Sequence, residues 1–235
     1  MIELYPQQKF NFKCDPEIEC FNSCCQDLQQ ILTPYDIVRL KQHFKVSSSD
    51  FLKQYTRSFI GPETGLPVIV LKTKSNLDLH CIFVSDSGCQ VYNDRPASCR
   101  YYPIARLVSR SRGTGKKTAS YMLIKEAHCK GHYAKHQQTL EKWTKSQELS
   151  DYDLYNDRML DLIAAKNNAG IRLLSEHQRN FFYMCCYDID SFQDYAETKG
   201  LATPKMIRRD SITEDIEWLD FALTWLEKEI ISASL

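Results

Sequence analysis

The sequence has no long hydrophobic run and no excess of either charge. Its 235 residues contain no stretch of about 18 consecutive apolar residues, so no segment is predicted to span a membrane. Lys and Arg together number 30, as do Asp and Glu, and this balance argues against a general nucleic-acid binder. The N-terminus, MIELYPQQKFNFKC, lacks the features of a signal peptide. We therefore expect a cytoplasmic protein that binds neither membranes nor nucleic acid.

Glycine is scarce, and the usual nucleotide and catalytic motifs are missing. The segment Gly113-Thr114-Gly115-Lys116-Lys117-Thr118 fails as a phosphate-binding loop, because Arg110 stands at the position of its first glycine and Lys117 at that of its Ser or Thr. It fails as a dinucleotide fingerprint because Thr118 replaces the last glycine. No methyl-donor pocket, Ser–His–Asp triad or Cys–His pair can be argued from the spacing.

Cysteine, by contrast, is abundant. Eight of the ten cysteines lie between residues 14 and 129, and the other two are the neighbours Cys185 and Cys186. Disulfides do not persist in a reducing compartment, so clustered cysteines favour a metal site over disulfide bonds. The candidate metal ligands are Cys14, Cys20, Cys24, Cys25, Cys81, Cys89, Cys99 and Cys129.

The spacing of these cysteines allows several metal sites. The first group reads Cys14-x5-Cys20-x3-Cys24-Cys25, and the second group contains the other four. Thiolates suit zinc, iron–sulfur clusters and cuprous copper, and eight of them supply two four-ligand sites or one site with spare ligands. The side chains of Cys24 and Cys25 tend to diverge, which favours a polynuclear arrangement over a single ion. A structural zinc knot and simple buried cysteines are the alternatives.

Other residues near the cysteines are weaker candidates. Arg95 and Arg100 flank Cys99, and their charges would offset a negatively charged thiolate cluster; surface ion pairs are the alternative. One of the histidines near Cys129 could replace a thiolate, although such residues are more often at the surface; they are His128, His132 and His136. Cys185 and Cys186 lie in an apolar helical segment and are predicted to be buried and inert.

The pattern of elements predicts an α+β fold. A loop-rich cysteine-cluster domain with short hairpins and helices is expected over residues 1–135, followed by a helical region over 136–235 that packs on it. Thr33 is predicted to cap a helix that Pro34 opens, and strands are predicted over 66–71, 77–83, 104–108 and 118–124. C-terminal helices are expected near 136–149, 151–166, 175–187, 191–199 and 213–231. Their expected N-caps are Ser150, Ser175, Ser191 and Thr213, with Gly200 after the fourth.

Four segments together resemble the YkgJ family of cysteine-cluster proteins, which are also described as CxxCxxCC zinc- or iron-chelating proteins. The segments are FKCDPEIECFNSCC, LTPYDIVRL, CIFVSDSGCQVYNDRPASCRYYPI and HCKG, within residues 10–135, and the tail segment FFYMCCYDIDSFQDYA is similar to longer members. The chain departs from the pattern between Cys14 and Cys20, where five residues replace two. The resemblance implies an iron–sulfur protein, and the related domain of flagellin lysine methylases implies a further enzymatic possibility.

These observations predict a protein that binds an iron–sulfur cluster, such as a 4Fe–4S cluster, with a redox or electron-transfer role. The first alternative is a zinc protein that is structural or carries metal. The second is a methylase-like enzyme that acts on a macromolecule. The sequence identifies no protein partner.

Overall fold

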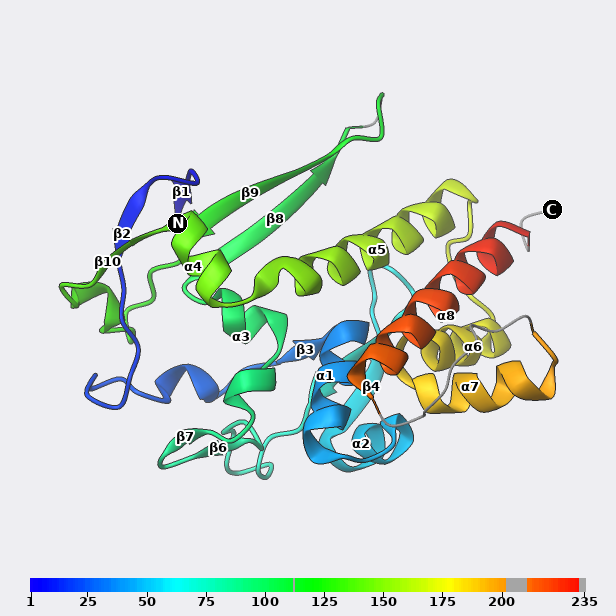
Figure 1. The fold of residues 1–235 in the computed structure, drawn as a ribbon, viewed down its shortest axis with the longest axis horizontal. Helices are drawn as coiled ribbons and strands as arrows, with labels where there is room; N and C mark the ends of the chain where they lie inside the picture. The colour runs from blue at the N-terminus through cyan, green and yellow to red at the C-terminus, as the bar shows by residue number, and fades with distance from the viewer. Residues whose placement is uncertain (112, 202–210, 233–235) are drawn as a thin grey trace. The chain divides into compact units, whose positions relative to one another are not determined.

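The computed structural model describes residues 1–111, 113–201 and 211–232, and it has the α+β fold predicted from the sequence (Figure 1). Contacts between residues group the chain into two units that alternate along the sequence. The first unit comprises residues 1–28, 73–92 and 96–151, and the second comprises 29–72, 93–95 and 152–235. The division into a cysteine-cluster domain over residues 1–135 and a helical region over 136–235 that packs on it stays a prediction.

The first unit is built from small antiparallel sheets. The strands β8 (Ile104–Arg110) and β9 (Lys117–Leu123) form a hairpin, as predicted. The strand β1 (Ile2–Leu4) pairs with the C-terminal end of β9. A second sheet joins β2 (Lys9–Asn11) to β10 (Gln137–Thr139). The remaining elements are η1 (Ser23–Cys25), β6 (Val84–Ser85), β7 (Gly88–Cys89), α3 (Ala97–Tyr101), η3 (Gly131–Tyr133) and α4 (Leu140–Ser146).

The second unit is mostly helical and has a larger apolar interior. Its sheet has the order β3-β5-β4, and helix α8 contacts α1, α6 and α7. Buried residues of the core include Phe51, Phe182, Phe192 and Leu219. The elements are β3 (Ile31–Leu32), α1 (Pro34–Phe44), α2 (Ser48–Tyr55), β4 (Thr56–Ile60), β5 (Pro67–Leu71), α6 (Glu176–Tyr187), α7 (Ile189–Thr198) and α8 (Ile212–Ser232). Helix α5 (Leu149–Asn168) begins in the first unit, and η2 (Tyr92–Asp94) lies at the border.

Some helix ends follow the predicted caps and others do not. Thr33 precedes α1 in a capping box with Asp36, and Ser175 precedes α6 in a capping box with Gln178, as expected. Gly200 has φ +61 after α7, which fits its predicted position. The other three predictions were wrong: α5 begins before Ser150, α7 before Ser191 and α8 before Thr213.

The strand predicted over 77–83 was also wrong. Residues 77–83 form a loop, and β5 pairs instead with β3 and β4. Within the loop, the Ser75 hydroxyl accepts hydrogen bonds from the N–H groups of Leu77 and Asp78, which turn the backbone. Only isolated bridges remain, between Gln26 and His80 and between Thr73 and Cys81.

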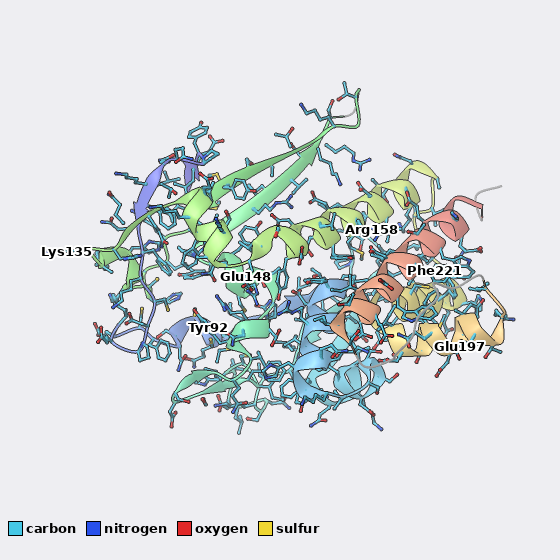
Figure 2. The ribbon with its side chains drawn as sticks, viewed as in Figure 1. Tyr92, Lys135, Glu148, Arg158, Glu197 and Phe221 are labelled. Carbon is cyan, nitrogen blue, oxygen red and sulfur yellow. The ribbon has the colours of Figure 1, made fainter. Side chains whose placement is uncertain are left out.

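A buried cation joins three helices of the second unit. Lys41 of α1 is 3 % exposed, and its Nζ lies 2.9 Å from carboxylate oxygens of Asp190 in α7 and Asp215 in α8. The side chain of Ser48 accepts a hydrogen bond from the Asp190 N–H. Nearby, Arg158 of α5 donates to Asp220 of α8 (Figure 2). These polar links hold α1, α5 and α7 to α8 around the core.

In the described part of the chain, no helix combines the length and the apolar character that a membrane span requires.

Candidate metal centre

All eight candidate ligands belong to the first unit, although they come from three separate segments of the sequence. Cys14, Cys20, Cys24 and Cys25 lie in the first segment, Cys81 and Cys89 in the second, and Cys99 and Cys129 in the third. Cys185 and Cys186 belong to the second unit, where they are 0 % and 1 % exposed in α6. Burial raises the pKa of both thiols, as expected of inert core cysteines.

The first cysteine segment is shaped by tight turns. Ser23 N–H donates to the Cys20 carbonyl at 3.0 Å, and Cys25 N–H donates to the Asn22 carbonyl at 2.9 Å. Asn22 has φ 68, a left-handed conformation that asparagine tolerates better than most residues, and it starts the short helix η1. Its side-chain amide also donates to the Ser85 carbonyl at 3.0 Å, which fixes this turn against β6.

Four of the thiols surround one small cavity. Cys14, Cys20, Cys24 and Cys129 line a space of about 10 Å³, together with the rings of Phe12 and Tyr102. The Lys130 N–H donates to the Cys20 sulfur at 3.1 Å. A backbone N–H that donates to a cysteine sulfur stabilises the thiolate form, which is the form that binds metal.

Gly131 allows the chain to approach this cavity closely. A Cβ at this position would lie 2.5 Å from the Lys13 carbonyl oxygen and 2.9 Å from the Phe12 ring. The Lys13 N–H in turn donates to the Gly131 carbonyl at 3.1 Å. Only glycine therefore lets the turn after Cys129 lie against the segment that carries Cys14.

The pKa values of the residues around this cavity reflect how closely its thiols lie to one another. Although Cys14 as a residue is exposed, its thiol is crowded by neighbouring atoms, and this desolvation raises its pKa to about 11; the charges of Cys24, Cys20 and Cys129 contribute further. Burial also raises the pKa of Tyr102, with added contributions from the neighbouring Cys129 thiol and Glu126 carboxyl. Thiols that repel one another as thiolates are stabilised when a cation lies between them.

The other four cysteines are brought together by backbone pairing. The Cys81 N–H donates to the Cys25 carbonyl at 2.7 Å, and the Val84 N–H donates to the Cys81 carbonyl at 3.0 Å. Across the β6–β7 hairpin, Val84 faces Cys89. The N–H groups of Phe83 and Val84 also donate to the Cys81 sulfur; burial raises the pKa of this thiol, and these bonds oppose the increase.

Cys25 connects these residues to Cys99 in α3. A hydrogen bond with the Cys24 side chain raises the pKa of Cys25, and burial raises it further. The charges of Cys99 and Cys81 add to the effect, so both thiols lie near Cys25. The same contact between the adjacent thiols lowers the pKa of Cys24 to about 7. This pair is therefore where the two sets of cysteines meet.

As the side chains stand, no three Cys, His, Asp or Glu donors of the described residues form a group that could hold an ion. A change of one χ1 rotamer moves a cysteine sulfur by roughly 3 Å, so the thiols can contract around a metal without movement of the backbone. The donor set fits zinc or iron, because both accept four thiolates.

The structure gives Arg100 a structural contact. Arg100 is 3 % exposed, and it donates to the Gln147 carbonyl at 2.9 Å. It also lies 3.8 Å from a carboxylate oxygen of Glu148, between α4 and α5 (Figure 2). Arg95 belongs to the second unit and is half-buried. That Arg95 and Arg100 offset the charge of a cluster stays a prediction.

The three candidate histidines occupy different places. His128 lines the first cavity and is exposed, with its Nε2 atom 3.5 Å from a carboxylate oxygen of Glu126. His132 packs against Phe12 with a ring separation of 5.3 Å, and burial lowers its pKa. His136 is exposed. Of the three, only His128 lines the cavity where it could replace a thiolate.

The sequence interpretation missed three residues that form the first cavity. Phe12 and Tyr102 line its apolar wall, and Gly131 permits the close approach of its two sides. A signal existed for two of them, since Tyr102 lies in the RYYP segment after Cys99 and Gly131 follows Cys129 by two residues. Phe12 gave no separate signal.

Comparison with known proteins identifies the cysteine region. A family model named CxxCxxCC, described as "Putative zinc- or iron-chelating domain", matches residues 13–130, half of the chain. The matched residues include all eight candidate ligands and exclude Cys185 and Cys186. No curated protein and no solved structure matches the chain.

Proposed function

We propose that this chain, which belongs to the CxxCxxCC family of zinc- or iron-chelating domains, uses its eight clustered cysteines to hold an iron–sulfur centre with a redox or electron-transfer role. Metal binding is the function that the family description supports. The iron–sulfur identity, the full ligand set and the redox role are our proposal.

The observation that carries the proposal is the separation of the cysteines. Eight thiols from three distant segments lie in one small unit, and the two remaining thiols lie in the core of the other. Backbone N–H groups donate to the sulfurs of Cys20 and Cys81. Such bonds are among the features that tune the potential of iron–sulfur clusters.

The exposure of the ligands is compatible with electron transfer. Cys14 and Cys99 are exposed, five other ligands are half-buried, and Cys129 is buried. A cluster held by these residues would lie near the surface, where a redox partner can approach it. This arrangement also requires a reducing compartment, since exposed free thiols would otherwise oxidise, and it agrees with the cytoplasmic location that we predict.

Zinc is a second candidate, and one observation favours it. Four thiols, those of Cys14, Cys20, Cys24 and Cys129, line the first cavity, and four is the number of ligands that one tetrahedral zinc ion takes. A zinc site would hold the loops of the first unit together without any redox change. Both candidates use the same thiolates, so the metal itself must be identified.

Anaerobic purification followed by iron, sulfide and zinc analysis tests the proposal. We expect iron and sulfide in similar amounts, a brown protein and absorbance near about 400 nm, which a zinc protein lacks. Cys99→Ala should lose metal, whereas Cys185→Ala, a matched change in the other unit, should retain it. Stoichiometric zinc without sulfide would favour the structural zinc protein, and equal metal loss in the two variants would refute our assignment of ligands.

A further inference from the structure

We infer that the eight cysteines form two adjoining four-thiolate metal sites rather than one joint centre. The first site consists of Cys14, Cys20, Cys24 and Cys129, and the second of Cys25, Cys81, Cys89 and Cys99. This inference rests on the proposed metal-binding function of these residues, but it does not depend on which metal is bound. Each site takes a tetrahedral thiophilic ion or one iron–sulfur cluster.

The first site is defined by a shared cavity. Its four cysteines line the same space of about 10 Å³, and none of the other four does. Two features hold its walls at this distance: the Lys130 N–H bond to the Cys20 sulfur, and the close approach of Gly131 to Lys13. The ligands therefore converge from the N-terminal segment and from the turn after Glu126.

The second site is defined by a backbone framework. The bond of 2.7 Å from the Cys81 N–H to the Cys25 carbonyl joins two of its ligands, and the β6–β7 hairpin places Cys89 opposite Val84. Val84 donates to Cys81, so Cys89 and Cys81 flank the same short hairpin. Cys99, in α3 of the same unit, is the remaining candidate ligand that does not line the first cavity, and it completes the set of four.

The short helix η1 separates the two sites. Cys24 and Cys25 lie next to each other in this 3-10 turn, where successive side chains point about 120° apart around the axis. Cys24 lines the first cavity and Cys25 does not, while the Cys25 carbonyl accepts the hydrogen bond from the Cys81 N–H, so a single peptide unit joins the two sites.

Each four-thiolate site has negative charge to be offset, since four thiolates around one divalent ion leave a net charge of −2. The N–H donors are divided between the sites, with Lys130 at the first and with Phe83 and Val84 at the second. Each site thus has its own donors for its negative sulfurs.

Titration of the apo protein with Co²⁺ alone, under anaerobic conditions, counts the sites. Tetrahedral cobalt thiolates give strong visible bands, so the equivalents needed to saturate the bands give the number of four-thiolate sites. We expect two equivalents for the full chain. Saturation at one equivalent, or no cobalt binding, would overturn the inference.

Paired alanine variants then assign the ligands. Cys24→Ala and Cys25→Ala should each bind one equivalent. The double variant Cys14→Ala/Cys24→Ala, with both changes in one site, should still bind one. The double variant Cys24→Ala/Cys89→Ala, with one change in each site, should bind none. Equal cobalt loss in the two double variants would refute the division of the cysteines.

Two controls keep these outcomes decisive. Far-ultraviolet circular dichroism checks that the helices of the second unit persist in every variant, and Cys185→Ala should bind two equivalents. Where an internal variant fails to fold, the single variants Cys14→Ala and Cys89→Ala give the same one-equivalent test. If the purified protein contains no iron or sulfide but binds two equivalents of cobalt, the iron–sulfur proposal fails while the division into two sites stands.

Discussion

The two units of this chain are stabilised in different ways. About two thirds of the buried hydrophobic side chains among the described residues belong to the second unit, which packs its helices around an apolar core. The first unit has short strands, many loops and a small core, and it holds all eight clustered thiols. A bound metal contributes folding free energy where it ties loops together. We therefore expect metal to stabilise the first unit and hydrophobic burial the second.

Metal removal is the strongest test of this difference between the two units. Structural zinc supplies about 10–16 kcal/mol of apparent binding free energy in small zinc domains, and chelation should remove most of the stability of the first unit. We expect hydrogen exchange to rise across residues 1–28, 73–92 and 96–151 while helices α6 and α7 stay protected. Added metal should restore protection. Equal loss of protection in both units would show that they do not depend on metal differently.

The converse experiment destabilises the second unit by replacement of Lys41. Lys41→Met leaves the buried carboxylate of Asp215 and the half-buried carboxylate of Asp190 without their cation, and removal of one partner of a buried ion pair costs about 3–5 kcal/mol. Denaturant unfolding followed by the fluorescence of Trp218 and Trp225 measures this loss. Metal content should not change.

Lys53→Met is the matched control for that experiment. Lys53 is exposed on α2, so its replacement should change stability by less than about 0.5 kcal/mol. If Lys41→Met releases metal as readily as it lowers stability, the two units are not independent, and the comparison between them has to be abandoned.

Much of the secondary structure could be predicted because local chemistry determines it. Thr33 and Ser175 each precede a residue three positions on that completes a capping box, so the start of each helix was visible in the sequence. The two strands of the β8–β9 hairpin were predicted over 104–108 and 118–124, within the bounds that the structure shows to one residue. Ser191 was not a cap, because its hydroxyl donates to Asp188, which itself precedes α7.

The pairing of strands could not be predicted, since it depends on distant segments. The strand β4 has one buried residue, Thr56, followed by four exposed ones, so it lacks the alternation that marks a half-buried strand. It nevertheless pairs with β5 over five residues, and the loop 77–83 is left without that partner. The membership of residues 29–72 in the second unit is a long-range property of the same kind.

For the site, the sequence predicted which cysteines belong together but not how they divide. The division depends on the left-handed turn at Asn22 and on the bond from Cys81 to Cys25, which join segments more than 50 residues apart. Asn22 looked like any polar loop residue. The adjacency of Cys24 and Cys25 was the single local sign of the two-site arrangement that we propose.

As the pH falls, the first unit should lose its metal at a higher pH than the one at which the second unit loses stability. Protons compete with metal for thiolates, whose ordinary pKa is about 8.5, so the first unit should lose metal first as the pH falls. In the second unit, burial alone would raise the pKa of Asp190, but Lys41 and Ser48 hold it below its ordinary value of 3.8. The folded state therefore binds this proton less readily than the unfolded state, and Asp190 stabilises the fold above about pH 3.8.

The stability from Asp190 is lost only as the pH falls below that value, at about 1.4 kcal/mol for each unit of the shift. Asp215 acts in the opposite direction, because burial raises its pKa and its protonation favours the fold. The visible bands of bound cobalt should therefore disappear at a higher pH than the tryptophan signal of the second unit changes. Coincident transitions would contradict the separate stabilisation of the units.

The smallest expected effect is that of replacing Arg100, a buried residue in α3 of the first unit. Arg100→Ala removes a positive charge close in sequence to Cys99, and reduction adds negative charge to a cluster. If Arg100 offsets that charge, the variant should be harder to reduce, with a lower potential in protein-film voltammetry. Arg100→Lys keeps the charge and should restore most of the potential.

The alternative is that Arg100 has only a structural role, through its hydrogen bond to the Gln147 carbonyl. Loss of a buried hydrogen bond costs about 1–3 kcal/mol of stability, and in this case it would leave the potential unchanged. The two variants separate these roles, since lysine replaces the charge but not the geometry of the guanidinium. A stability loss in both variants with no shift in potential would make Arg100 a link between α3 and the segment before α5, and the negative charge of the thiolates would then be offset by backbone N–H groups instead.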